Sequence, residues 1–303
     1  MVDRYQDPAR PDDSVVKAFA AEVRALLCRR GIEQMRADAD ETARRFAATN
    51  IAMPAAAYLQ GIARVLSGDL DSGDAFFEGV ISIGESGAPD VLAGALCQRS
   101  LVAMARGHWD QAAALATDAA AVGRRAGIED SYASPLVSAV QARVALHRGD
   151  AAAARRELVS AQRSRPLLTY ALPSLAVQAR IELTRAHLAL ADIAGARTLM
   201  QEIDELLGRR PGLGTLVGEA KQLRDQLATV RGPGTLGASA LTGAELRLLP
   251  MLCTHLSVSE IAAELFLSPH TIKSQVYSLY RKLGTKSRSQ AVTRARELGL
   301  VEA

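Results

Sequence analysis

Several residue types and motifs are scarce or missing in this sequence, and each absence excludes a class of protein. The three cysteines, Cys28, Cys97 and Cys253, are too far apart to form a metal-binding or redox pair, and so sparse a set is typical of a reducing cytoplasm. No apolar run approaches the roughly 18 residues of a membrane-spanning helix, and no charged and then apolar leader is present. We therefore expect a cytoplasmic protein that does not bind membranes.

Motifs of catalysis and cofactor binding are also missing. There is no GxxxxGK phosphate loop, and the alternating runs of β-branched residues that would predict a sheet are absent. His108, His147 and His187 fall in different parts of the chain, without a close histidine or acidic partner, so they do not predict a metal site. We expect no enzyme activity and no metal or other cofactor.

The net positive charge of the chain comes from its carboxy-terminal part. The net charge is +3, and residues 241–303 hold eight basic and five acidic residues, whereas residues 1–240 hold 28 of each. An excess of Lys and Arg in one segment is typical of a part that binds nucleic acid.

Residues 241–298 carry the start signals of four short helices. Thr242, Ser257 and Ser287 are each followed three residues later by Glu or Gln, which is the spacing of a reciprocal capping box. Ser268 precedes a proline, which is tolerated at the first helical position because its missing N–H needs no partner there. These signals predict helices near residues 243–253, 258–265, 269–283 and 288–298.

The second and third of these helices are predicted to form a helix-turn-helix. Only three residues, Phe266, Leu267 and Ser268, separate them, which predicts a sharp change of direction. On the third helix an apolar stripe recurs at intervals of four, three and four residues, at Ile272, Val276, Leu279 and Leu283. One face of this helix should therefore pack on the domain core.

The rest of the third helix is polar and basic, as a surface that enters a major groove would be. Lys273, Ser274, Tyr277 and Arg281 lie away from the apolar stripe. Between Lys273 and Arg296 the chain carries seven Lys and Arg residues and no Asp or Glu, which suits a phosphate backbone. We predict that this segment binds double-stranded DNA.

This segment closely resembles the LuxR-type helix-turn-helix domain. The residues that carry the resemblance are Leu241, Thr242, Glu245, Ile261, Ala262, Leu265, Ser268, Thr271, Lys273, Lys282, Leu283, Gly284, Ser287, Arg288, Ala291 and Leu298–Gly299–Leu300. It departs from the family pattern at His255, where the family has Gly, and at Gln275, where the family has His. Gln275 can still donate a hydrogen bond to a phosphate.

The resemblance implies a mode of DNA binding. The third helix would enter the major groove, with Lys273, Ser274 and Tyr277 at bases or nearby phosphates and Thr271 and Lys282 at phosphates. It also implies a homodimer on a two-fold operator, paired through the fourth helix at residues 288–298. We predict dimer contacts from Ala291, Val292 and Ala295.

Residues 14–230 are predicted to form helix pairs in tandem. Turns at Gly68, Gly107 and Gly149 each end one apolar helix and begin another, and Ala191 repeats the position without glycine, at spacings of 39, 42 and 42 residues. Prolines begin the first helix of successive pairs, at Pro54, Pro89, Pro135 and Pro173. A period near 40 residues predicts an α-solenoid.

The alanine-rich pairs resemble the tetratricopeptide-like repeats found upstream of LuxR-type domains in large bacterial regulators, whose ATP-binding module is missing here. The predicted fold class is all-α: a tetratricopeptide-like α-solenoid followed by a four-helix LuxR-type helix-turn-helix domain. The predicted domains are a disordered leader at 1–13, the repeats at 14–230, a flexible Gly- and Pro-containing linker at 231–240 and the DNA-binding domain at 241–303.

Aromatic residues near the helix starts leave two interpretations open. Trp109, Tyr58, Tyr132 and Tyr170 either lock the two helices of a pair together, which we favour, or line a concave groove for an effector. The effector of such a repeat domain could be a small molecule, a peptide or a protein.

Two functions are compatible with the sequence. The first is a sequence-specific transcriptional regulator whose repeats receive a ligand or protein signal. The second is an interaction scaffold whose helix-turn-helix serves protein contacts or non-specific nucleic-acid binding. The exposed face of the third helix separates them, because only a groove reader requires sequence preference.

Overall fold

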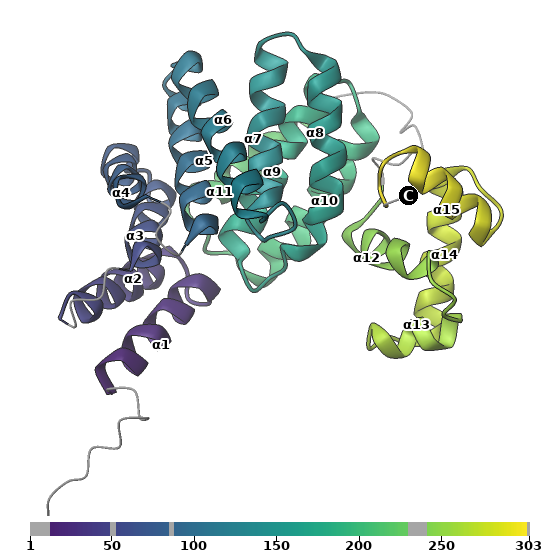
Figure 1. Ribbon diagram of the computed structural model, residues 1–303, viewed down its shortest axis with the longest axis horizontal. Helices are drawn as coiled ribbons and strands as arrows, with labels where there is room; N and C mark the ends of the chain where they lie inside the picture. The colour runs from purple at the N-terminus through teal and green to yellow at the C-terminus, as the bar shows by residue number, and fades with distance from the viewer. Residues whose placement is uncertain (1–12, 49–52, 85–87, 230–240, 302–303) are drawn as a thin grey trace, which may run out of the picture.

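The computed structural model describes residues 13–48, 53–84, 88–229 and 241–301 (Figure 1). Within these ranges all regular secondary structure is helical and no strand occurs, which confirms the predicted all-α class. Helix α1 begins at Asp13, the last residue of the predicted leader. The rest of that leader and the predicted linker at 231–240 lie outside the described residues.

The first ten helices pack as five successive pairs. We call these pairs, together with the eleventh helix, the helical array. The pairs are α1 (Asp13–Leu27) with α2 (Ile32–Ala47), α3 (Pro54–Leu66) with α4 (Leu70–Ile83), α5 (Pro89–Ala105) with α6 (Trp109–Ala126), α7 (Ser134–His147) with α8 (Ala151–Ser164), and α9 (Pro173–Ala189) with α10 (Ile193–Arg209). A short 3-10 helix, η1 (Arg165–Leu167), follows α8, and α11 (Thr215–Thr229) ends the array. Figure 1 shows the pairs stacked side by side.

The turns between the two helices of a pair form where the sequence predicts them. Gly68, Gly107 and Gly149 have φ angles of 92°, 78° and 77°, in the left-handed region that glycine adopts without strain. Ala191 takes the same place with φ 56°. After three of these turns an aspartate caps the next helix by accepting a hydrogen bond from the backbone N–H three residues on, at Asp69, Asp150 and Asp192.

Prolines begin the first helix of four pairs, as predicted. Pro54, Pro89 and Pro173 occupy the first position of α3, α5 and α9, and Pro135 occupies the second position of α7. Small residues then let the two helices of a pair approach closely. A Cβ atom at Gly61 of α3 would lie 2.5 Å from the ring of Phe77 in α4, so a larger side chain would separate these helices.

Helix α11 packs against the array instead of extending the stack. Its apolar face, Leu216, Ala220, Leu223 and Leu227, is buried in the same hydrophobic core as the pairs, and the helix contacts both α3 and α9. Figure 1 shows α11 in the middle of the array. Helix α11 therefore covers part of α3 and α9, the first helices of two pairs.

The two ends of the array touch. Nε of Arg210, just after α10, donates a hydrogen bond of 3.1 Å to the carbonyl of Leu27 in α1. Gly212 lies so close to Gly31 that a Cβ at Gly212 would be 2.9 Å from the Cα of Gly31. These contacts join the first pair to the last and close the stack.

The aromatic residues differ in what they contact. Trp109 of α6 stacks on His147 of α7 with centroids 3.9 Å apart, so it joins successive pairs and not the two helices of one pair. The Tyr170 ring, just before α9, lies 5.3 Å from the guanidinium of Arg209 at the end of α10, within one pair. Tyr58 packs on Phe77 of its own pair, at 5.8 Å, but also lines a cavity with Tyr132.

His187 differs from its prediction, because its Nδ1 lies 2.9 Å from Oδ2 of Asp192, an acidic neighbour five residues on. No group of three or more His, Cys, Asp or Glu side chains in the described part of the chain is arranged to hold a metal ion. Among the described helices none is both long and apolar enough to span a bilayer.

The last four helices form a separate hydrophobic core. They are α12 (Gly243–Leu252), α13 (Val258–Glu264), α14 (Pro269–Leu283) and α15 (Arg288–Glu297), each within one residue of its predicted bounds. We call these helices the carboxy-terminal domain.

Candidate nucleic-acid interface

Helix α14 is fixed at both ends and along one face. Oγ of Ser268 accepts a hydrogen bond of 3.1 Å from the N–H of Thr271 at the start of the helix, and Gly284 ends it with φ 70°. The predicted apolar stripe is buried, since Ile272, Val276, Leu279 and Leu283 all lie in the core of the carboxy-terminal domain. The rotation of the helix is therefore set by its sequence.

The opposite face of α14 is open to solvent. Lys273, Ser274 and Arg281 are exposed, and Tyr277 exposes 72 % of its surface. No ion pair to Lys273 or Arg281 is formed within the described residues. This surface, which we call the groove face, stays accessible although the domain is docked on the helical array.

Thr271 is less accessible than the four residues of the groove face. It is partly buried, and its Oγ1 lies 2.8 Å from Oγ of the capping Ser268. Its hydroxyl retains acceptor and donor capacity at the amino-terminal end of α14, where the helix dipole also favours an anion.

The turn between α13 and α14 is tight and strained. Leu267 donates its N–H to the carbonyl of Ala262 at 2.8 Å, which closes the turn. Phe266 has φ 52°, a left-handed conformation that is costly for an aromatic residue, and its side chain is 95 % exposed. The turn thus places an apolar ring in solvent beside the start of α14.

The start signals of the domain are confirmed with one difference. Thr242 with Glu245 and Ser257 with Glu260 form full reciprocal capping boxes, and the hydrogen bonds from Ser257 lower the pKa of Glu260. At α15 the Ser287 hydroxyl accepts from the N–H of Gln290 at 3.3 Å. The Gln290 side chain, however, accepts from the N–H of Lys286 at 2.9 Å, so the third box is displaced by one residue.

Lys282 has a structural partner that the sequence did not reveal. Its Nζ lies 2.7 Å from Oε2 of Glu245, the carboxylate that caps α12, and both side chains are largely buried. This pair ties the end of α14 to the start of α12. Contact with a phosphate would require the same ammonium group to serve both partners.

Arg288 also has a structural role. Its guanidinium donates to the carbonyls of Leu252, Leu256, Met251 and Thr254, at 2.9, 2.6, 3.1 and 2.8 Å. These carbonyls lie at the end of α12 and in the following turn, where helical partners are missing. His255, which stands where the family has Gly, is not among the described residues with positive φ, so this turn does not require glycine.

The predicted dimer contacts at Ala291 and Ala295 are wrong. Both side chains are 0 % exposed and belong to the core of the carboxy-terminal domain. The resemblance implies pairing through this helix, but the apolar side of α15 packs in the core of its own domain. Val292 is partly buried, and the exposed side of α15 carries Thr293 and other polar residues.

A buried polar contact holds the carboxy-terminal domain on the helical array. Arg165 in η1 is 1 % exposed and donates through Nη2 to the carbonyl of Leu241 at 2.6 Å. Oε1 of Glu202 in α10 accepts the N–H of Gly243, the first residue of α12, at 2.7 Å. The array thus supplies partners to the amino-terminal end of α12.

Glu202 is also the centre of an ion-pair network. Its carboxylate lies 2.8 Å from Nε of Arg180 and 3.4 Å from Nη2 of Arg165. Burial tends to raise the pKa of Glu202, but the two guanidinium groups outweigh this and hold the pKa below its usual range. Burial lowers the pKa of Arg165. We call these residues, with Leu241 and Gly243, the docking contact.

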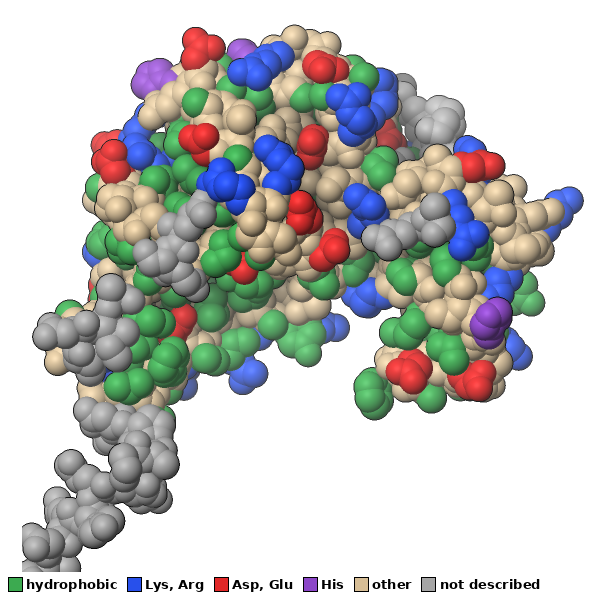
Figure 2. All heavy atoms as spheres, viewed as in Figure 1, with side chains coloured by type: hydrophobic (Ala, Val, Ile, Leu, Met, Phe, Trp, Pro, Cys, Tyr) green, Lys and Arg blue, Asp and Glu red, His purple; other side chains and the backbone are tan. Residues whose placement is uncertain are grey.

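The carboxy-terminal domain lies beside the helical array in the space-filling view (Figure 2). Figure 2 shows Lys and Arg side chains spread over the part formed by α12–α15, with acidic side chains at its lower end. A helix with a buried apolar stripe, an exposed polar and basic face and a preceding tight turn defines the helix-turn-helix class of DNA-binding domains.

Comparisons with known proteins agree with this class. The model of the family described as bacterial regulatory proteins, luxR family, matches residues 239–295. The spore germination protein GerE of Bacillus subtilis is 37 % identical over 62 residues, which cover 20 % of this chain and 84 % of that protein. The chain belongs to the luxR family of bacterial regulatory proteins.

Two further relatives match over only part of their length. The probable transcriptional regulatory protein NarL of Mycobacterium tuberculosis is 30 % identical over 131 residues, 43 % of this chain and 57 % of that protein. The probable HTH-type transcriptional regulator GfsR of Streptomyces halstedii is 36 % identical over 80 residues, 23 % of this chain and 33 % of that protein. The chain thus spans little more than half the length of NarL.

Proposed function

We propose that this protein is a sequence-specific, DNA-binding transcriptional regulator that inserts α14 into the major groove. The observation that carries the proposal is the groove face, which is polar, exposed and backed by a buried apolar stripe. Membership of the luxR family and the regulatory names of its relatives support it.

Within the groove face we assign different contacts by position. Lys273 and Ser274 lie in the amino-terminal half of α14 and Tyr277 lies one position past its middle; all three reach base edges or nearby phosphates. Thr271 and Arg281, near the two ends of α14, contact phosphates on either side. Lys282 contributes a phosphate contact only through the part of its ammonium group that Glu245 leaves free.

We propose that the regulator binds a two-fold site as a homodimer through the exposed side of α15. The burial of Ala291 and Ala295 removes them from this surface. Ser289 and Thr293 are exposed and lie opposite the buried alanines on the helix, with the partly buried Val292 beside them. A polar surface of this kind suits a dimer that is stable only on DNA.

We assign the reception of a signal to the helical array, residues 14–230, and DNA binding to residues 241–303. The separate hydrophobic cores of the two parts support this division. The docking contact, which joins them, gives a signal in the array a direct route to the start of α12.

DNA selection tests this proposal. Full-length protein is incubated with fragments of genomic DNA at near-physiological salt, and recovered fragments are sequenced. We expect a shared two-fold motif, and about 1–3 kcal/mol weaker binding to it for Lys273→Ala or Tyr277→Ala, because each loses a contact to the site.

Lys221→Ala is the matched control, since Lys221 is an exposed lysine on α11, outside the carboxy-terminal domain. Its binding should equal that of the unchanged protein. Recovery without sequence preference, unaffected by Lys273→Ala, would contradict the proposal and favour an interaction scaffold. A motif without two-fold symmetry would contradict the dimer alone.

A further inference from the structure

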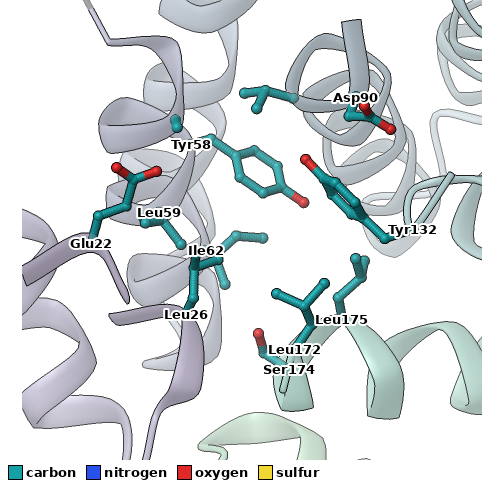
Figure 3. Close-up of a pocket in the computed structure, with 12 residues that line it drawn as sticks. Glu22, Leu26, Tyr58, Leu59, Ile62, Asp90, Tyr132, Leu172, Ser174 and Leu175 are labelled. Carbon is teal, nitrogen blue, oxygen red and sulfur yellow. The ribbon is translucent and has the colours of Figure 1, made fainter. Parts of the chain in front are cut away.

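A small cavity opens between the first helices of successive pairs. It encloses about 180 Å³ where α1 and α3 meet the starts of α5, α7 and α9 (Figure 3). Its apolar lining includes Leu26, Leu59, Ile62, Leu172 and Leu175. A cavity of ~150 Å³ lined by such residues can hold benzene, so this one accommodates an apolar group about the size of one ring.

The cavity is acidic as well as apolar. Glu22 and Asp90 are its charged lining residues, and among the described residues no Lys, Arg or His lines it. Oε2 of Glu22 and Oδ1 of Asp90 are buried and have no hydrogen-bond partner among the described residues. Figure 3 shows Glu22 reaching from α1 on one side and Asp90 from α5 on the other. Burying carboxylate oxygens without a donor is costly, which points to a partner that is bound in function.

Two tyrosines lie between these carboxylates. Figure 3 shows the rings of Tyr58 and Tyr132 side by side, between Glu22 and Asp90. Tyr132 is 40 % exposed, so the cavity can be reached from solvent. Burial raises the pKa of Tyr132 to about 12, with further contributions from Asp90 and Glu22, and burial of Glu22 raises the pKa of that carboxyl. The effect of Asp90 and Glu22 on Tyr132 indicates a negative potential at the site, which no basic side chain among the described lining residues opposes.

Gly94 allows Tyr58 to occupy its position. A Cβ atom at Gly94 of α5 would lie 2.9 Å from the Tyr58 hydroxyl and 3.1 Å from its Cζ. The Tyr58 ring is thus fitted between α3 and α5, where it lines the cavity together with Tyr132.

We propose that this cavity binds a small organic amine, with the protonated nitrogen in the negative field of Glu22 and Asp90 and a ring-sized apolar body among the leucines. The inference rests on the proposed role of the helical array as the part that receives a signal, and it names the chemical class of that signal. An anion would be repelled by the two carboxylates, and a neutral apolar molecule would leave their oxygens without donors.

Calorimetric titration of the full-length protein tests the proposal. The probe is 2-phenylethylamine, and the matched compounds are 2-phenylethanol, which lacks the charge, and phenylacetate, which reverses it. We expect the amine to bind with a Kd of ~1 mM or tighter, as is reasonable for a ligand of this size. Both matched compounds should bind at least about tenfold more weakly, because they lose a charge-assisted hydrogen bond.

Two variants and a control locate the site. Glu22→Gln and Asp90→Asn should each weaken amine binding about tenfold, because they remove the charge and keep the shape. Glu22→Gln should leave the melting temperature of the free protein unchanged or higher, since Glu22 has an uncompensated buried oxygen. Glu33→Gln, at an exposed glutamate on α2, should bind the amine normally.

Absence of amine binding, equal binding of phenylacetate or 2-phenylethanol, or full affinity in both Glu22→Gln and Asp90→Asn would each overturn the proposal. The DNA selection is a separate measurement. A two-fold motif recovered without amine binding would support the proposed regulator and contradict only the amine proposal. Amine binding without a motif would support the amine proposal and contradict the proposed regulator.

Discussion

Ala191 adopts a left-handed backbone conformation at a turn where three preceding helix pairs use glycine. Its φ of 56° costs a residue with a Cβ atom about 1–2 kcal/mol relative to the right-handed region. The side chain is exposed, so no packing contact offsets this cost. The strain is local, and it is retained because the turn is fixed by the helices on either side.

Ala191→Gly should therefore stabilise the protein. We expect a gain of about 1 kcal/mol in the free energy of unfolding, reduced by the greater freedom of glycine in the unfolded chain. The denaturation midpoint of the full-length protein measures it. Ala189→Gly is the control, since Ala189 is also exposed but ends α9 in a helical conformation; it should destabilise by roughly 0.5–1 kcal/mol. A lower midpoint for Ala191→Gly would contradict the assigned strain.

At the level of single helices, α15 stabilises the turn before α13 through Arg288. One guanidinium group serves four carbonyls there. Lysine carries the same charge but lacks the planar arrangement of donors that reaches several carbonyls together. The contact therefore depends on the shape of the side chain and not only on its charge.

Arg288→Lys should loosen α12 and α13. We expect a loss of about 2–3 kcal/mol, because several carbonyls lose a charged donor. Hydrogen exchange of the α12 and α13 amides in the full-length protein should accelerate accordingly. The same change at Arg294, an exposed residue paired with Glu297 at 2.8 Å, should leave exchange unaltered. Equal behaviour of the two variants would argue against this role for Arg288.

Helices and their caps were largely predictable, because their signals are local. The start of each helix in the carboxy-terminal domain depends on residues three positions apart, and the apolar stripe of α14 follows from helical periodicity alone. The prediction failed at Ala291 and Ala295, where small apolar residues fit a dimer surface and a domain core equally well. Only the three-dimensional packing of α15 decides between the two.

At the scale of the whole molecule, the docking contact positions the carboxy-terminal domain on the array. The sequence did not predict it, because Arg165, Glu202 and Gly243 are distant in the chain and share no motif. The same reason hid the cavity, whose lining comes from α1, α3, α5 and α9 and from the segment before α7.

Glu202→Gln should weaken the docking contact. It leaves Arg165 buried without a charged partner, which typically costs about 3–5 kcal/mol. We expect faster hydrogen exchange at the N–H of Gly243, measured on the full-length protein. Glu205→Gln, at an exposed glutamate of the same helix, is the control. An unchanged exchange rate at Gly243 would contradict the contact.

The same contact should be sensitive to acid. Because the pKa of Glu202 is depressed, its contribution is fully present above the ordinary glutamate pKa of about 4.3 and is lost as the pH falls through the lower, folded value. The hydrogen-exchange rate of the Gly243 N–H, corrected for the intrinsic pH dependence of exchange, should therefore be constant near neutral pH.

The closure of the array shortens the distance between its two ends. In an open stack the terminal units fray independently, and a disturbance at one end passes through every intervening unit. Here the carbonyl of Leu27 on α1 meets the side chain of Arg210, which directly follows α10. Helix α1 carries Glu22 and α10 carries Glu202, so one hydrogen bond connects the first helix to the end of the helix that bears the docking contact, without crossing the three pairs between.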